Sequence, residues 1–336
     1  MPTRMPTRFT VLGSGAWGTA LAIVLAQKPE HRVTLWSARP ETADWHVSRE
    51  NRRLLPGVPI PETICLTTRI ADALAQADLV VAAIPTVHLR ATLARVAASM
   101  PGGVPALSVV KGLENDTLRR PSEILCEVLG PRTVGVLSGP SHAEEVARGL
   151  PTTLVAASDD AGFAQRVQHY FSTDRFRVYT NGDLVGVELA GAMKNVIGIA
   201  AGINDGLGFG DNSKSALLTR GLAEMARFGA ALGADPRTFW GLAGMGDLIT
   251  TCISRHGRNR AVGERLARGE TLQAIQSSTP MIAEGVYTAR SVFEKSQATG
   301  IAMPISTEVY RVLYEGKNPR EAVSDLMLRE LRSEKW

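Results

Sequence analysis

Cysteine is scarce in this chain of 336 residues, and its distribution argues against two classes of protein. Cys65, Cys126 and Cys252 show neither paired spacing nor the spacing of metal ligands. A small disulfide-stapled domain and a zinc-binding module are therefore not supported. A sparse, odd number of thiols fits a reducing cytoplasm, which is the location that we expect.

Charge of one sign is not concentrated anywhere in the sequence. The formal net charge is +4, and the lysines and arginines are dispersed. Binding of small anions such as phosphates is therefore favoured over binding of nucleic acid.

No low-complexity tract is present and 44% of the residues are hydrophobic. The chain is thus long and apolar enough for a large core, and its length favours two domains over one.

Long hydrophobic runs are absent apart from residues 184–203 (LVGVELAGAMKNVIGIAAGI). This run carries Glu188, Lys194 and Asn195, and each central charge would cost about 2.5–3.5 kcal/mol to insert into a bilayer. We therefore expect a buried helix and no membrane span. The N-terminal repeat MPTRMPTR has no apolar core, so we do not expect a secretory signal there.

Lys194 is the most unusual residue of that run. On a helix, positions 187, 190, 191, 194 and 198 share one face, and here they read Val, Ala, Gly, Lys, Gly. The ammonium is therefore expected to rise from small side chains with room beside it. Burial of a lysine is costly unless the charge is paired, and it lowers the pKa. This combination suits a proton donor in a cleft.

The two halves of the chain have different periodicity. Before residue 184, short apolar runs alternate with helical stretches, which predicts an α/β domain with a mostly parallel sheet covered on both faces (1–183). From 184 onward helical periodicity dominates, which predicts an all-α domain (184–336). The Gly- and Ala-rich face of 184–203 and the long later helices favour helix-mediated dimerisation. Strands are expected at 9–12, 32–36, 79–84, 106–110, 134–137, 153–157 and 176–179. Helices are expected at 17–27, 87–98, 121–129, 215–232, 259–268, 286–297 and 306–314.

A glycine-rich turn follows the first expected strand. Gly13, Gly15 and Gly18 form G-x-G-x-x-G between a strand and a helix, with a second strand at 32–36. The first glycine permits the tight turn, the second lets backbone approach a pyrophosphate, and the third lets the helix pack on the strand. This context predicts dinucleotide binding by a Rossmann-type domain; a structural glycine turn is the alternative.

The acidic residue that usually holds the ribose hydroxyls of NAD is missing. The second strand ends in Trp36-Ser37-Ala38-Arg39, and the first acidic residue after it is Glu41. Ser37 and Arg39 are able to accept a 2′-phosphate instead, which favours NADPH over NADH. The alternative for Arg39 is a solvated loop charge.

Further polar residues follow strand ends, where open parallel sheets bind ligands. Lys111 comes directly after one expected strand, and SGPSHA (138–143) comes after another. Lys111 has the alternative of an ordinary surface charge. Ser141 and Glu144 have the alternative of a capping box at the start of a helix, which is compatible with anion binding there.

In the second half, Asp247 follows a glycine-rich bend, and Arg255, Arg258 and Arg260 lie at an expected helix start. Arginine forks bind phosphate bidentately, and helix N-termini add N–H donors. A solvated charged face is the alternative. Because no Ser-His-Asp, Cys-His or metal-ligand constellation is present in the sequence pattern, hydrolysis and metal chemistry are not supported.

Sequence blocks spread over the whole chain resemble one known family. The blocks are GSGAWGTALA, VVKGLE, SGPS-A, GVELAGAMKNVIGIAAG, GLGFGDNSKSALLTRGLAEM, GMGDLITTC and GRNR, in that order. They are similar to those of bacterial-type NAD(P)-dependent glycerol-3-phosphate dehydrogenases, from Phe9 to the C-terminal region. The resemblance implies reversible reduction of dihydroxyacetone phosphate to sn-glycerol 3-phosphate with NADPH or NADH. It also implies a cytoplasmic homodimer that supplies phospholipid synthesis.

The same resemblance implies roles for individual residues. Lys194 would be the proton donor and acceptor, and Asn195 and Thr251 would line the site. Contacts to substrate are implied for Lys111, Gly139, Ser141, Asp247, Gly257, Arg258 and Asn259. Contacts to the cofactor are implied for Ala16, Trp17, Lys111, Ala143, Arg258, Ile282 and Glu284. The glycine turn and the tip of the second strand add Gly13, Gly15, Gly18, Ala38 and Arg39 to the expected cofactor contacts.

Two positions depart from the family pattern. Gly257 stands where a small hydroxyl residue is usual, so a hydroxyl donor is lost and we expect the backbone N–H to face the phosphate. Ala38 stands where His or Arg is common, and its neighbour Arg39 is expected to substitute. Two other functions stay open: a dehydrogenase of similar build for a different hydroxy acid, and a sensor that binds NAD(P) without turnover.

Overall fold

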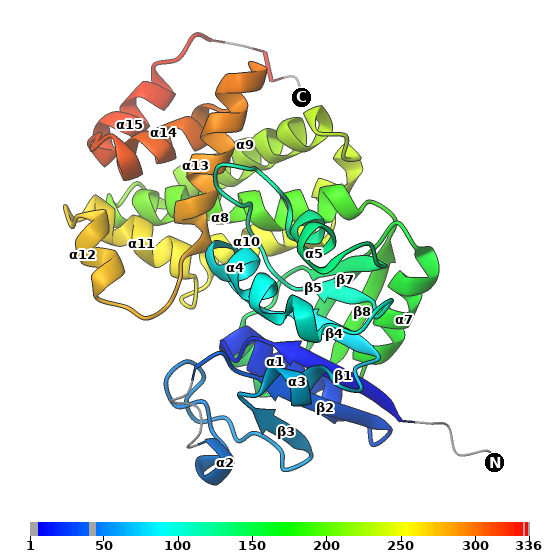
Figure 1. Ribbon diagram of the computed structural model, residues 1–336. Helices are drawn as coiled ribbons and strands as arrows, with labels where there is room; N and C mark the ends of the chain where they lie inside the picture. Colours follow the sequence, from blue (N-terminus) through cyan, green and yellow to red (C-terminus); the bar gives the residue numbers. More distant parts are fainter. Residues whose placement is uncertain (1–5, 40–44, 332, 335–336) are drawn as a thin grey trace. The chain divides into compact units, whose positions relative to one another are not determined.

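The computed structural model describes residues 6–39, 45–331 and 333–334 (Figure 1). The chain divides into two compact units. The first unit comprises Met1–Val110 and Pro121–Leu184, and the second comprises Lys111–Arg120 and Val185–Trp336. A single division near residue 183 would assign Lys111–Arg120 to the first domain. The structure instead groups this ten-residue segment with the helical second unit.

The first unit is built on one eight-stranded sheet of order β3-β2-β1-β4-β5-β6-β7-β8. Every neighbouring pair is parallel except β6 and β7, so the prediction of a mostly parallel sheet is confirmed. The chain runs outward from β1 to β3 and then returns to the other side of β1, which creates a switch point for ligand binding. The strands are β1 (Thr7–Leu12), β2 (His31–Trp36), β3 (Ile64–Thr67), β4 (Leu79–Ala82), β5 (Ala106–Ser108), β6 (Val134–Ser138), β7 (Thr152–Ala157) and β8 (Phe176–Asn181).

Helices cover both faces of this sheet. Successive side chains of a strand point to opposite faces, so Phe9 and Val11 of β1 enter one hydrophobic cluster and Leu12 enters the other. The first cluster includes residues of α1, α6 and α7, and the second includes residues of α3, α4 and α5. The helices of this unit are α1 (Ala16–Ala26), α2 (Trp45–Ser48), α3 (Ile70–Leu74), α4 (Thr86–Val96), η2 (Ala97–Ser99), α5 (Pro121–Leu129), α6 (Ala143–Ala147) and α7 (Ala161–Phe171).

The described part of the second unit is helical, as predicted. Its core includes Val196 and Ile199 of α8, Val262 of α11, Val286 of α13 and Val309 of α14. The helices are α8 (Leu184–Gly206), α9 (Gly210–Ala231), η3 (Pro236–Trp240), η4 (Leu242–Gly246, a π-helical turn), α10 (Asp247–Ile253), α11 (Arg258–Ala267), α12 (Leu272–Ser277), α13 (Glu284–Thr299), α14 (Pro304–Tyr314) and α15 (Pro319–Met327).

Helix α8 has the length and apolar composition of a membrane span, but 89% of its apolar window is buried inside the protein. A helix that is apolar all round belongs in a core. Its glycines pack against α11: a Cβ on Gly202 would lie 1.9 Å from the carbonyl oxygen of Arg260, and one on Gly263 would lie 2.0 Å from that of Ile199. The glycines at this contact face another helix of the same chain, so they give no support to dimerisation through this face.

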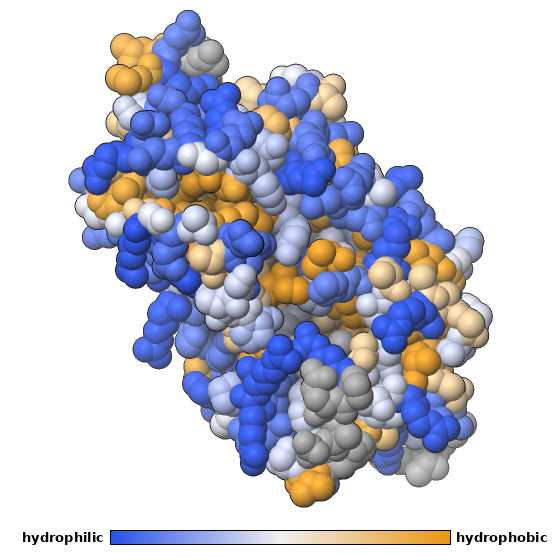
Figure 2. Space-filling view, turned by 60° about the vertical axis from the view of Figure 1, so that its left-hand side comes forward, coloured by the Kyte–Doolittle hydropathy of each residue, from blue (hydrophilic) through white to orange (hydrophobic). Residues whose placement is uncertain are grey.

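The molecular surface that Figure 2 shows is largely covered by hydrophilic residues, with smaller hydrophobic areas between them.

Candidate active site

The glycine-rich turn of the first unit has the geometry of a phosphate-binding loop. Gly13 adopts φ +112°, and a Cβ there would lie 2.5 Å from the carbonyl oxygen of Ala83. A Cβ on Gly18 would lie 1.9 Å from the carbonyl oxygen of Gly13, whereas nothing lies within 4 Å of one on Gly15. The first and third glycines are therefore required by packing, and the second leaves open space. Helix α1 begins at Ala16 with no side-chain cap, so its first N–H groups are available to an anion.

Trp17 adds a second indication of a ligand at this turn. Its indole N–H is buried and has no hydrogen-bond partner among the residues that the structure describes. Buried donors nearly always have a partner in the complete assembly. The turn and this donor together fit a bound dinucleotide.

The tip of β2 carries Ser37, Ala38 and Arg39. The Ser37 side chain is buried, and its oxygen accepts hydrogen bonds from Ser14 Oγ (2.7 Å) and from the Arg39 N–H (3.2 Å). Ser37 thus ties the glycine turn to β2, and Ala38 and Arg39 are exposed at the tip of this strand. Glu41 lies outside the described residues.

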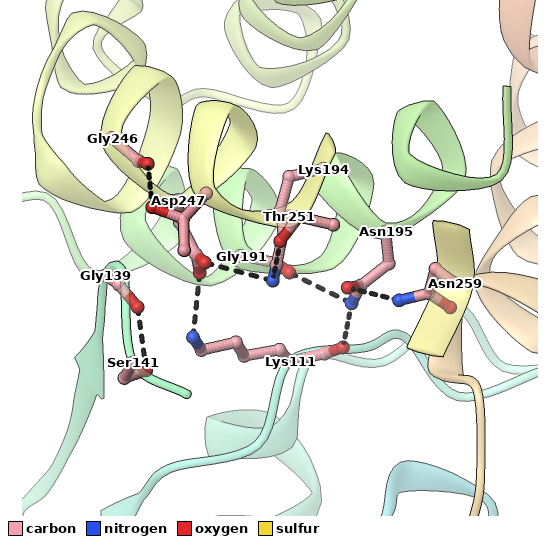
Figure 3. Close-up of polar contacts among 11 residues, drawn as sticks. Lys111, Gly139, Ser141, Gly191, Lys194, Asn195, Gly246, Asp247, Thr251 and Asn259 are labelled. Carbon is pink, nitrogen blue, oxygen red and sulfur yellow. Dashed lines mark hydrogen bonds and ion pairs between the residues drawn. The ribbon is translucent and has the colours of Figure 1, made fainter. Parts of the chain in front are cut away.

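The SGPSHA segment follows β6 in the first unit. Gly139 adopts φ +126°, and the Ser141 hydroxyl donates to the Gly139 carbonyl at 2.8 Å (Figure 3). Helix α6 begins at Ala143, with His142 rather than Ser141 at its N-cap. The alternative of a capping box at Ser141 is therefore wrong, because the serine lies one residue too early.

Three charged side chains of the second unit form a compact cluster (Figure 3). Asp247 Oδ1 accepts from Lys194 Nζ at 3.0 Å, and Asp247 Oδ2 accepts from Lys111 Nζ at 2.7 Å. The exposed fractions of the side chains are 9% for Lys194, 3% for Asp247 and 15% for Lys111. One buried carboxylate therefore holds two ammonium groups, so the cluster has a net positive charge and attracts an anion.

Thr251, one turn after Asp247 on α10, completes the surroundings of Lys194. Its hydroxyl oxygen lies 2.6 Å from Lys194 Nζ. A Cβ on Gly198 would lie 2.7 Å from Thr251 Cγ2, so the threonine fills the place beside the small residues of α8. The expectation of free room is therefore wrong beside Gly198. Gly198 instead lets Thr251 approach the lysine.

Burial controls the protonation of this cluster. Burial lowers the pKa of Lys194 to about 8; Asp247 opposes the shift, and the charges of Lys111 and Arg258 add to it. For Asp247, burial raises the pKa, but the charges and hydrogen bonds of Lys111 and Lys194 outweigh burial, so the net direction is downward. Near neutral pH the cluster thus pairs an ionised aspartate with a lysine that gives up its proton readily.

A chain of amide hydrogen bonds ends at the backbone carbonyl of Lys111. The Gly285 N–H donates to Asn259 Oδ1 at 2.9 Å, and Asn259 Nδ2 donates to Asn195 Oδ1 at 2.8 Å. Asn195 Nδ2 then donates to the Lys111 carbonyl at 2.8 Å. Asn195 and Asn259 therefore connect α8, α11 and α13 to the backbone of Lys111.

The arginine cluster separates into different roles. Arg260 pairs with Asp205 at 2.6 Å and with Glu264 at 2.7 Å, so it holds helices together. Arg258 is exposed at the first position of α11, and its Nη1 donates to the Ile282 carbonyl at 3.0 Å, two residues before Glu284 opens α13.

Gly257 differs from what we expect of it. Its N–H donates to the Ser254 carbonyl at 3.1 Å, so the prediction that this group faces a phosphate is wrong. A Cβ at position 257 would lie 2.7 Å from the carbonyl oxygen of Thr251. The tight turn before α11 therefore explains the glycine.

These features define the class of protein. A Rossmann-type sheet with a glycine turn that fits a dinucleotide, together with a buried lysine–aspartate cluster in a helical unit, is the arrangement of a two-unit dehydrogenase. Residues 8–164 match the family model described as NAD-dependent glycerol-3-phosphate dehydrogenase N-terminus, and residues 183–324 match its C-terminus. The chain belongs to the NAD-dependent glycerol-3-phosphate dehydrogenase family.

Individual relatives agree with this assignment. A protein of Chlorobium limicola named glycerol-3-phosphate dehydrogenase (NAD(P)+) is 50% identical over 96% of this chain and 98% of the relative. The crystal structure of glycerol-3-phosphate dehydrogenase from Coxiella burnetii is similar with a TM-score of 0.93 and 36% identity, covering 97% of this chain and 100% of that one. A ketopantoate reductase from Ralstonia eutropha, at 14% identity and a TM-score of 0.60, shares the fold alone.

Proposed function

We propose that this protein catalyses the reversible reduction of dihydroxyacetone phosphate to sn-glycerol 3-phosphate with NADPH or NADH. Membership of the family supports the reaction and the cofactor. The observation that carries the mechanism is the contact of Lys194 with both Asp247 and Thr251 in a buried, positively charged cluster. A protein that only senses a dinucleotide has no need of a buried lysine that can donate a proton.

Lys194 is the proposed proton donor. When bound, the nicotinamide supplies a hydride to the ketone carbon. The carbonyl electron pair moves to the ketone oxygen, which takes a proton from the Lys194 ammonium as negative charge develops. An ammonium has three N–H donors, and Asp247 and Thr251 accept two of them, so the third is the proposed donor to the ketone. In the oxidation direction, neutral Lys194 accepts the hydroxyl proton.

Arg258 is the proposed anchor of the substrate phosphate. The guanidinium has five donors, and among the described residues Nη1 donates to the Ile282 carbonyl, which leaves donors for a bidentate contact with a phosphate. Lys111 adds positive charge from the cluster, and the helix start at Arg258 adds N–H groups. The full set of proposed substrate contacts is Lys111, Gly139, Ser141, Lys194, Asp247, Arg258 and Asn259.

The glycine turn of the first unit carries the proposed phosphate-binding part of the cofactor site, and Arg39 favours NADPH through its charge. Proposed cofactor contacts are Gly13, Gly15, Ala16, Trp17, Gly18, Ala38, Arg39, Lys111, Ala143, Arg258, Ile282 and Glu284. We further propose, from the family resemblance, a cytoplasmic homodimer that supplies glycerophospholipid synthesis.

Loss of NADPH absorbance with dihydroxyacetone phosphate tests this function, and phosphate-free dihydroxyacetone is the matched control. We expect turnover of the phosphorylated ketone and little turnover of the control. Activity with an unphosphorylated hydroxy acid instead would indicate the other dehydrogenase. Binding of NADPH without turnover of any of these substrates would indicate a sensor.

A further inference from the structure

In the sequence, the segment Lys111–Arg120 lies between two parts of the first unit. In the structure it belongs to the second unit. It joins β5, by way of Val109 and Val110, to α5, which begins directly after it at Pro121. It contains no helix or strand. The position of the Lys111 ammonium therefore depends on what holds this irregular backbone.

The first end of the segment is held at α8 and α10. The Lys111 carbonyl accepts from Asn195 of α8, and the ammonium binds Asp247 of α10. Gly112 follows immediately. Glycine restricts the backbone least, so Gly112 leaves the direction of the chain after Lys111 poorly fixed. We therefore expect the rest of the segment to help hold Lys111 in place.

The middle of the segment is a closed loop under backbone strain. Asp116 and Leu118 adopt φ values of +66° and +59°, which are unfavourable for residues with a side chain. The Glu114 N–H donates to the Arg119 carbonyl at 3.0 Å and closes the loop. Ser291 Oγ of α13 donates to Asn115 Oδ1 at 2.7 Å. Such a conformation persists only where its surroundings fix it.

The far end of the segment is held by a buried ion pair. Arg120 Nη1 lies 2.6 Å from Glu188 Oε2, and the Glu188 side chain is 0% exposed. Glu188 and Asn195 are seven residues apart on α8, so they share one face and lie about 10 Å apart along the axis. One face of α8 therefore binds both ends of the segment. Separating this pair costs free energy, because opposite charges that are buried together lose a close electrostatic contact.

We propose that Arg120 and Glu188 are positioning residues for Lys111: their ion pair fixes the far end of the strained 111–120 segment on α8 and so keeps the Lys111 ammonium on Asp247. Neither residue touches the proposed reacting atoms. They act through the segment, and the inference rests on the proposed function only for its kinetic consequences.

The kinetic consequence is electrostatic. Lys194 contacts Asp247 and Thr251, and it interacts electrostatically with Lys111, Arg258 and Cys252; the charge of Lys111 lowers the pKa of Lys194. When Lys111 leaves Asp247, that carboxylate serves Lys194 alone and the pKa of Lys194 rises. The pH above which ketone reduction declines then moves upward, which a general loss of stability does not produce.

Arg120→Gln and Glu188→Gln test the proposal. Amide hydrogen exchange of peptides covering 111–120 measures the hold on the segment without any activity, and we expect faster exchange in both variants. For dihydroxyacetone phosphate, we expect kcat/KM to fall on the order of tenfold, mainly through KM, with the alkaline limb of the kcat profile at higher pH. In a Lys111→Met background, Arg120→Gln should cause no further loss, because the effect passes through Lys111.

Glu308→Gln is the matched control, since Glu308 is a buried carboxylate of the same unit that pairs with Lys317 and Arg311 instead of the segment. It should leave segment exchange and the pH profile unchanged. Unchanged exchange in Arg120→Gln, which is the less buried site and the safer variant for folding, overturns the proposal. The proposal is also overturned if Arg120→Gln lowers kcat/KM by the same factor in the Lys111→Met background as in the wild type. Inactive wild-type protein with the expected exchange pattern would instead refute the proposed function and leave the positioning intact.

Discussion

Gly198 lies one turn after Lys194 on α8, and its lack of a side chain sets the distance between Thr251 and the lysine. In Gly198→Ala the new Cβ would lie 2.7 Å from Thr251 Cγ2 and 3.4 Å from Asn259 Cβ. Carbon atoms prefer separations of about 3.5–4.0 Å, so Thr251 has to retreat by about 1 Å. The 2.6 Å contact between Lys194 Nζ and Thr251 Oγ1 is then lost or strongly weakened.

The expected loss of activity follows from that contact. A hydrogen bond to a charged group contributes about 1.5–3 kcal/mol, which corresponds to roughly a 10- to 100-fold fall in kcat if the bond orients Lys194 in the transition state. Stability changes less, because overpacking costs about 1–3 kcal/mol while alanine in place of glycine returns about 1 kcal/mol in a helix. The lesion should therefore be mainly catalytic.

Steady-state NADPH oxidation together with thermal unfolding separates these effects. Thr251→Val, which removes the hydroxyl and keeps the shape, should reproduce the fall in kcat, and the double variant should lose little more. Gly102→Ala, where nothing lies within 4 Å of the new Cβ, is the matched control. A Gly198→Ala enzyme with kcat within twofold of wild type would refute the assigned role of Thr251.

Other changes have equally defined outcomes. Burial raises the pKa of Glu224 to about 7 from 4.5, so its contribution is fully present below pH 4.5 and about 3 kcal/mol of unfolding free energy is lost as pH rises through 7. Glu224→Gln should remove that slope in urea unfolding at pH 5 and pH 8, and an unchanged slope would disprove it. Asp247→Asn removes the charge that raises the pKa of Lys194, so the pKa should fall below about 8 and kcat at pH 7 should drop on the order of tenfold or more. If the pH at which kcat declines were the same in Asp247→Asn as in the wild type, the proposed pairing of Asp247 with Lys194 would be contradicted. Arg39→Ala should lower the NADPH to NADH ratio of kcat/KM by about tenfold; an unchanged ratio would remove the argument for a 2′-phosphate contact.

Local patterns predicted the parts of the structure that depend on near neighbours in sequence. The glycine turn and α1 follow from spacing within ten residues, and α8 follows from its continuous apolar composition. Strand β3 was not predicted because Ile64–Thr67 has four residues, two of them outside the buried core. Helix α9 begins at Gly210 instead of residue 215, since the glycines before it do not exclude a helix start.

Contacts between distant residues could not be predicted in this way. Lys194 contacts Asp247 and Thr251, which lie 53 and 57 residues later in the sequence, so local patterns predict the lysine but not its partners. The space beside Gly198 looked open because nothing local fills it. The Arg120–Glu188 pair spans 68 residues and was missed, although a glutamate in an apolar helix signals a buried partner. The N–H of Gly257 is bonded within the turn before α11, and sequence spacing alone does not predict this bond.

The pH dependence of kcat in wild type and Lys194→Ala tests the proton-donor role most directly. Reduction needs protonated Lys194, so kcat should be constant below about pH 8 and fall tenfold per pH unit above it, while oxidation of glycerol 3-phosphate should rise through the same range. Lys194→Ala should lose this dependence and about 10²- to 10⁴-fold in kcat. Near-normal turnover of Lys194→Ala with the wild-type profile would contradict the account.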